Sequence, residues 1–199
     1  AAIALSGDIS FANADKVDKY TNGDTTVTSV SDTIENVKKI HNLADVKMGA
    51  AAVTVSDSIT NKTQLTETLT FTTGTVTVQT VSEDKTDLAA LANAGGAYGR
   101  VRLAGADITV TDQVNKAEVD TIDAYHGGSG TVTVQSVTGS VTDMTNLDGD
   151  ATISIAGAAI ALSGDISFAN ADKVDKYTNG DTTVTSVSDT IENVKKIHN

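Results

Sequence analysis

The sequence predicts a repeat solenoid, built from parallel β-sheet coils that are joined by short helical connections. Residues 1–42 return without a mismatch as residues 158–199, at an offset of 157 residues. Runs that alternate Val with Thr, Gln or Ser have the two-residue period of a half-buried strand. Between these runs, apolar residues fall at helical spacing. Strands that alternate with helices at a fixed period indicate parallel pairing in a repeat array.

The 157-residue period divides into three units with similar endings, VKMG at Gly49, VRLAG at Gly105 and ISIAG at Gly157. A strand-like run follows each ending, and the second half of each unit carries another. We therefore name four repeats: a (1–49), b (50–105), c (106–157) and a′ (158–199, identical to 1–42). We expect the chain to be a window of a longer tandem array, in which residue 200 of the parent would be Leu.

Local patterns place the elements within each repeat. Strands are clearest over residues 76–81 and 132–137, where Val is expected to point inward and Thr outward. Residues 32–40 and 115–125 carry apolar side chains near helical spacing and predict short helices. At the ends of these connections we expect the helix N-caps Asp32 and Asp84 and the turn or C-cap glycines Gly23, Gly74 and Gly127.

Two other architectures also fit many short strands. One is an array of antiparallel β-sandwich repeats of the immunoglobulin kind, and the other is a closed α/β domain. The helical connections count against the sandwich, because its strands are joined by hairpins and Greek-key loops. The fixed period counts against a closed domain.

Composition excludes several classes of function. The 199-residue chain has no Cys, so disulfide scaffolds, zinc fingers, iron–sulfur clusters and thiol catalysis are excluded. It has 14 Lys and Arg against 26 Asp and Glu, and this net charge of −12 opposes binding to nucleic acid phosphates. No apolar run approaches the ~20 residues of a membrane helix. We expect no nucleic-acid partner and no membrane span.

No group of residues indicates catalysis. Neither His41 nor His126 has a second histidine at ligand spacing or a Ser in a Gly-x-Ser-x-Gly elbow. Phosphate-binding glycine motifs are also absent. The sequence therefore predicts a protein that is not an enzyme, with histidines that are solvated at helix ends and with no required cofactor.

Acidic turns are the candidate metal sites, because Ca²⁺ needs only several oxygen ligands in a flexible loop. Asp148 and Asp150 flank Gly149 and are the best candidates. An EF-hand is excluded, since its register would place Met144 and Ile155 where carboxylates are required. Looser calcium sites could use Asp57, Asp112 or Asp8 after the first strand of a repeat, where Asp is also an ordinary turn or capping residue.

Thr is common and recurs in pairs that fall at equivalent places in three repeats. Regular stacking of these pairs would make a hydroxyl ladder of the kind that binds ice or glycans. The simpler interpretation is that Thr is the default outward residue of a strand. The pairs are Thr26 and Thr28, Thr75 and Thr77, and Thr131 and Thr133.

Runs such as VTVSDSITNKTQL (53–65), TGTVTVQTVSEDKTDLAAL (73–91) and ITVTDQVNKAEVDTIDA (108–124) resemble the Thr/Asp/Ala-rich tandem repeats of giant bacterial secreted and cell-surface proteins. That class includes type I-secreted adhesins and the giant cell-surface motility protein of marine cyanobacteria. One departure is that the calcium-binding nonapeptide of type I-secreted proteins is not satisfied after Gly127–Gly130, because Val132 stands where Asp belongs.

This resemblance implies an extracellular, cell-surface role as a structural module of a filament, stalk or adhesin shaft. Its partners would be neighbouring repeats of the same chain, or identical subunits joined end to end. The alternative is a binding module, which would act in calcium-dependent adhesion or bind ice or glycans through the Thr-rich face.

Overall fold

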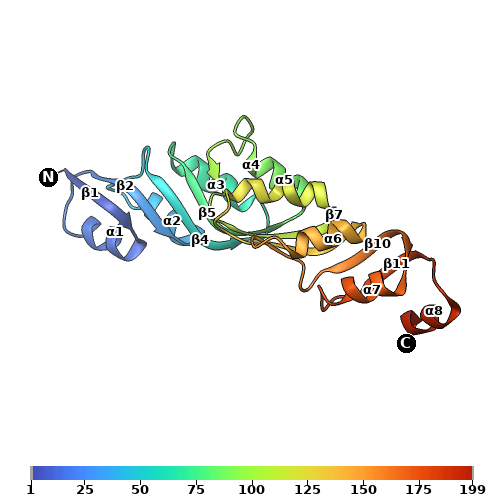
Figure 1. Cartoon of the computed structure of the whole chain (residues 1–199). Coiled ribbons are helices and arrows are strands. Elements are labelled where there is room, and N and C mark those ends of the chain that lie inside the picture. Colours follow the sequence, from blue (N-terminus) through green and yellow to red (C-terminus); the bar gives the residue numbers. More distant parts are fainter. Residues whose placement is uncertain (1, 199) are drawn as a thin grey trace. The chain divides into compact units, whose positions relative to one another are not determined.

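The computed structural model describes residues 2–198 and shows an α/β fold of eleven strands and eight helices in this range, with a helix between successive long strands (Figure 1). The chain forms two compact units, Ala1–Ser82 with Thr86–Ala106, and Glu83–Lys85 with Asp107–Asn199. Repeats a and b supply β1 (Ile3–Ile9), α1 (Phe11–Asp18), β2 (Thr25–Asp32), α2 (Ile34–His41), β3 (Val46–Lys47), β4 (Ala52–Ile59), α3 (Gln64–Phe71), β5 (Val76–Glu83), α4 (Lys85–Ala92) and β6 (Val101–Arg102). Repeats c and a′ supply β7 (Asp107–Asn115), α5 (Lys116–His126), β8 (Val132–Gly139), α6 (Val141–Asp148), β9 (Ile153–Ser154), β10 (Ala159–Ile166), α7 (Phe168–Asp175), β11 (Thr182–Val187) and α8 (Ile191–His198).

Within each unit the long strands are neighbours in chain order, and every pair is parallel. The first unit has the order β1-β2-β4-β5, with β3 beside β2 and β6 beside β5. The second has the order β7-β8-β10-β11, with β9 beside β8. A helix joins each long strand to the next, which is the crossover that parallel pairing requires.

The predicted solenoid is wrong, and so is a β-solenoid filament repeat. The parallel strands and helical connections are present, but each connection only returns the chain to add one strand at the edge of an open sheet. The sheet is neither closed nor coiled. The sandwich alternative is also wrong, because the ladders of the described residues are parallel and no second sheet faces the first in either unit.

The two long strands of a repeat pair almost in register, whereas neighbouring repeats are offset. Ile3 lies opposite Thr25 across β1 and β2. The next repeat begins four residues further along, since Ala52 of β4 lies opposite Ser29. The short strand β3 pairs with Thr25 and Thr26, so that β3 and β4 together cover the outer edge of β2. The same offset recurs between β8 and β10 in the second unit.

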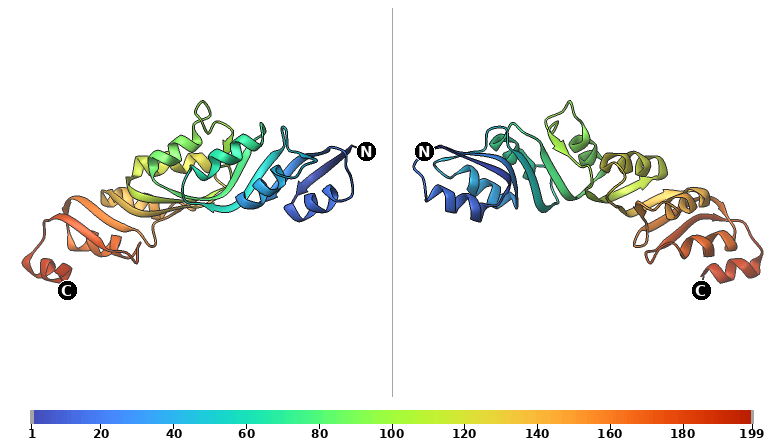
Figure 2. Two further views of the ribbon diagram at one scale, coloured as in Figure 1. Left: turned by 180° about the vertical axis from the view of Figure 1, so that it is seen from behind. Right: turned by 60° about the vertical axis from the view of Figure 1, so that its left-hand side comes forward.

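One face of each sheet is covered by helices and the other carries hydroxyls. Along β2, Val27 and Val30 are buried, whereas Thr26 and Thr28 are exposed, and β8 shows the same alternation. Figure 2 shows α1 and α2 lying together beside β1 and β2 in both views. Parallel sheets are usually covered on both faces. Here the outward-facing residues are polar, so the second face of the sheet can be exposed to solvent.

The structure moves one of the predicted N-caps and confirms one of the predicted C-caps. Helix α2 begins at Ile34, and its N-cap is Thr33, whose hydroxyl accepts a hydrogen bond from the Asn36 N–H at 3.2 Å. Asp32 is therefore not its N-cap. Gly127 is confirmed as the C-cap of α5, with φ +68°.

Gly74 is a turn glycine, one of the two predicted alternatives, and not the C-cap of α3, which is Thr72. A Cβ at this position would lie 2.3 Å from the Ala51 carbonyl oxygen, so only glycine lets the turn before β5 approach the start of β4. Gly180 approaches the Ala158 carbonyl oxygen at the same distance before β11. The close approach is thus a recurring feature of the turn that precedes the second strand of a repeat.

We predict that Gly74→Ala lowers the free energy of unfolding by about 1–3 kcal/mol, because backbone must shift to admit the methyl group. Gly157→Ala is the matched control, since a Cβ there meets nothing within 4 Å and φ is not positive. The control should change stability by less than about 1 kcal/mol, in the stabilising direction. Urea denaturation followed by circular dichroism measures both. Equal effects of the two substitutions would contradict the close-approach role.

Candidate functional site: one sequence in two environments

The identical segments 1–42 and 158–199 form the same elements but have different neighbours. Strands β1 and β10, helices α1 and α7, strands β2 and β11, and helices α2 and α8 correspond. Repeat a is followed in its unit by β4 and α3, whereas a′ is preceded in its unit by β8 and α6. A comparison of the two copies therefore shows what each neighbour buries.

The preceding repeat covers the first strand and first helix of a′. Ile160, Leu162 and Val174 are fully buried. Their counterparts Ile3, Leu5 and Val17 are only half-buried in repeat a. The difference arises because β8 pairs with β10, with Ser136–Gly139 opposite Ala159–Leu162, and because α6 contacts α7.

Tyr20 and Tyr177 report the same difference at the ends of α1 and α7. Tyr20 is 84% exposed, the most exposed large apolar side chain of the described residues. The Tyr177 hydroxyl lies 3.3 Å from the Thr145 Oγ1 of α6, and its ring is half-buried. The surface that α6 covers in a′ is therefore open in repeat a.

The following repeat covers the second helix of repeat a. Val37 is fully buried, whereas the identical Val194 is 41% exposed and Ile191 is 79% exposed. In repeat a, α2 packs against α3, where the His41 and Phe71 rings stack with centroids 4.3 Å apart. Lys38 Nζ also lies 2.8 Å from Glu67 Oε1.

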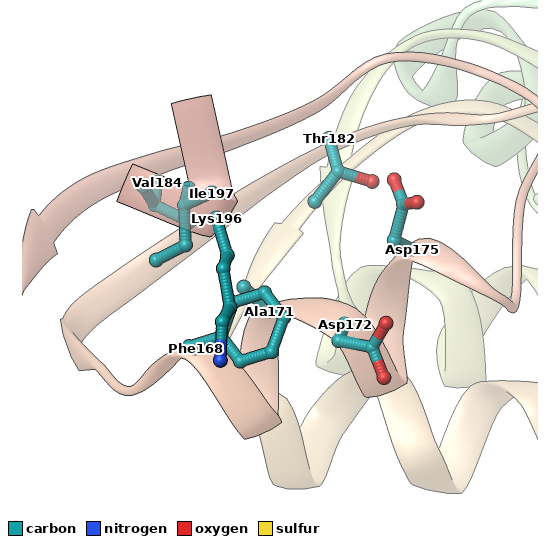
Figure 3. A pocket seen from close by; sticks show the side chains of 8 residues that line it. All are labelled: Phe168, Ala171, Asp172, Asp175, Thr182, Val184, Lys196 and Ile197. Atoms are coloured by element: carbon teal, nitrogen blue, oxygen red, sulfur yellow. The ribbon is translucent and has the colours of Figure 1, made fainter. Parts of the chain in front are cut away.

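A pocket opens in a′ where the following repeat is missing. Figure 3 shows it between α7, β11 and α8, with Lys196 beside the Phe168 ring and with Asp172 and Asp175 on the α7 side. Half of the corresponding positions in repeat a are fully buried, namely Ala14, Thr25, Val27 and Ile40. The pocket thus reflects incomplete packing of a′ and carries no cluster of catalytic groups.

A recurring aspartate joins each of four helices to the strand that follows it in the sheet. Its carboxylate accepts a hydrogen bond from the first N–H of the helix, where orphan donors and the positive end of the dipole favour an anion. The local sequence patterns did not predict this pairing, although a Ser-Asp or Thr-Asp that recurs in or just after the strands was its signal. The pairs are Asp32 with Phe11 (2.9 Å), Asp57 with Ile34 (2.7 Å), Asp112 with Lys85 (2.9 Å) and Asp189 with Phe168 (2.9 Å).

The calcium candidates have hydrogen-bond partners of other kinds. Asp57 and Asp112 bind helix N-termini as described above. Asp150 Oδ1 accepts from the Thr152 N–H and hydroxyl, which lowers the pKa of Asp150, whereas Asp148 is exposed at the end of α6. Among residues 2–198, no three His, Asp or Glu side chains gather in a metal-binding group. The calcium sites stay a prediction.

The hydroxyl pairs form a continuous ladder in only part of the sheet. In repeat c, Thr133 lies between Thr109 and Ser154. In repeat a, Thr26 lies between Ala4 and Lys47. In repeat b, Thr77 lies between Thr54 and Arg102. The cationic side chains interrupt the row of hydroxyls at the edge of each of these two repeats.

His126 is fully buried at the end of α5, so its expected solvation is wrong. Its Nδ1 accepts hydrogen bonds from the Gly128 and Gly130 N–H groups, at 3.1 and 3.2 Å. Nε2 therefore carries the proton and donates to Asp123 Oδ1 at 2.9 Å. This histidine closes the turn that leads into β8, and Asp123 Oδ1 also accepts a hydrogen bond from the Thr152 hydroxyl at 2.8 Å.

A scan against protein-family models and searches of curated proteins and of solved structures found no match to the chain. Among residues 2–198, no helix combines the length and the apolar composition that crossing a membrane requires.

We predict that the same substitution has different effects in the two copies. Val37→Ala should lower the free energy of unfolding by about 2 kcal/mol, because a buried side chain is truncated. Val194→Ala is the matched control in an identical helix and should cost less than about 1 kcal/mol. Denaturant midpoints measure both changes. Equal losses would show that the following repeat does not stabilise α2.

We also predict a loss of stability in acid that depends on Asp32. Burial raises the pKa of Asp32, but hydrogen bonds from the Phe11 N–H, the Asn36 amide and the Thr33 N–H outweigh it and lower the pKa overall. The carboxylate therefore stabilises the fold fully above its unfolded pKa of about 3.9, and this contribution is lost as pH falls through the lower folded pKa.

Thermal unfolding at pH 6 and pH 3 tests this dependence. The difference in melting temperature between the two pH values should be smaller in Asp32→Asn than in the wild-type chain. Asp148→Asn is the control, because it removes an exposed carboxyl that accepts no helix N–H. The prediction fails if both variants keep the wild-type acid sensitivity.

Proposed function

We propose that this chain is a structural repeat module of an extracellular bacterial surface stalk or adhesin shaft, with neighbouring repeats as its partners. The proposal rests on the way in which the two copies of the duplicated segment pack against their neighbours. One face of it packs against the preceding repeat in a′, and the opposite face packs against the following repeat in a. A module with two such faces is suited to addition in series.

Three further features support a structural role. The strand pairing and the four-residue offset recur in both units, so each added repeat extends the sheet by the same rule. The net charge of −12 keeps the exterior solvated. The sequence also resembles the Thr/Asp/Ala-rich repeats of giant secreted and cell-surface proteins, which motivates the location outside the cell.

The proposal is tested on native material with an antibody raised against residues 1–42. A denaturing gel should show the antigen in a chain of hundreds of kilodaltons, because a shaft needs many repeats. Antibody added to intact cells should label the surface, and protease added outside the cells should remove the signal.

Two outcomes would contradict the proposal. A single band near 20 kDa would mean that the repeats do not form a long chain. Labelling that requires permeabilised cells would exclude a surface location. A cytoplasmic protein of the same cells, probed on the same gel and after the same protease treatment, controls for lysis.

A further inference from the structure

We infer that the outer edge of β1 and α1 is a docking site for the edge formed by β8, β9 and α6 of a preceding copy of repeat c in the same chain. This inference rests on the proposed role as a repeat module, and it specifies which surface of the module receives which partner. The β8–β10 and α6–α7 contacts that serve as its template lie within one compact unit.

The strand edge supplies the first part of the argument. In a′, residues Ala159–Leu162 pair with Ser136–Gly139 of β8. The same four residues, Ala2–Leu5, occur in repeat a, where β2 occupies only the inner edge of β1. The outer edge of β1 thus presents backbone N–H and C=O groups to solvent, which is a template for another parallel strand.

The helix surface supplies the second part. On α7, Val174 is fully buried and the Tyr177 hydroxyl lies 3.3 Å from Thr145 Oγ1 of α6. On α1, the identical Val17 is half-buried and Tyr20 is 84% exposed. Covering Val17 and Tyr20 needs the α6 surface that covers their counterparts.

The turn between the two strands supplies the third part. In a′ the Asn179 N–H donates to the carbonyl of Ala156 at 2.7 Å. Ala156 lies between β9 and β10. The acceptor belongs to repeat c, so this bond crosses the docked edge. Asn22 occupies the position of Asn179 in repeat a. Docking therefore engages the strand, the helix and the turn of the segment together.

Thiol labelling tests the inference, because the chain has no cysteine and any introduced thiol is unique. Val17→Cys and Val174→Cys are compared in the 199-residue chain by their reaction with a maleimide or a disulfide reagent. Val17→Cys should react at least about tenfold faster, since Val174 is inaccessible unless the segment opens.

The decisive measurement places residues 1–157 before the full 199-residue chain. In this longer chain the Val17→Cys at the junction follows a repeat c, and its reaction rate should fall to that of Val174→Cys. Val194→Cys is the control at the opposite end of the chain, and it should keep its fast rate because α8 gains no neighbour.

An unchanged fast rate at Val17→Cys in the longer chain would overturn the inference. Equal protection of Val17→Cys and Val194→Cys would also overturn it, because protection would then not depend on the docked edge. A negative result in this experiment leaves the surface labelling of native cells unaffected, so failure of docking and failure of the proposed location are distinguishable.

Discussion

The rest of the structure depends on parallel pairing between strands that are joined through helices. No strand of a parallel sheet can satisfy its backbone groups with the segment that immediately follows it, so each relies on a neighbour more than twenty residues away. Because neighbouring repeats are offset by four residues, the outer edge of β2 pairs partly with β3 of its own repeat and partly with β4 of the next repeat. A repeat is therefore complete only when another follows it.

The aspartate contacts strengthen the same dependence. Asp57 belongs to repeat b, yet its carboxylate accepts from the Ile34 N–H at the start of α2 in repeat a. A carboxylate of one repeat thus binds the N-terminus of a helix in the preceding repeat, and this hydrogen bond joins the two repeats. Asp32 and Phe11 make the equivalent contact within repeat a, which aligns α1 with β2. Two of the predicted calcium ligands, Asp57 and Asp112, therefore bind helix N-termini.

Open edges are the cost of this design. Strand edges that are exposed can pair with unintended partners, and proteins normally cover or charge them. Here the exposed or partly exposed apolar residues of the two identical segments lie at opposite faces, Val17 and Tyr20 on one copy and Ile191 and Val194 on the other. The two faces are uncovered in the copy that lacks the corresponding neighbour and covered in the other. Serial addition of repeats would remove the exposure at each junction.

Sequence alone determined the repeat, the strand over residues 76–81, the helix over residues 115–125 and the C-cap Gly127, because these follow from local period and backbone preference. It did not determine that the strands of each unit share one open sheet, that Asp32 caps α1 and not α2, or that His126 is buried. Those features depend on packing or on partners that are distant in the chain, and one local pattern is compatible with several different packing arrangements. The duplicated segment shows the limit directly: Val37 and Val194 have identical sequence surroundings over the shared 42 residues, and only the presence of α3 decides that the first is buried and the second exposed.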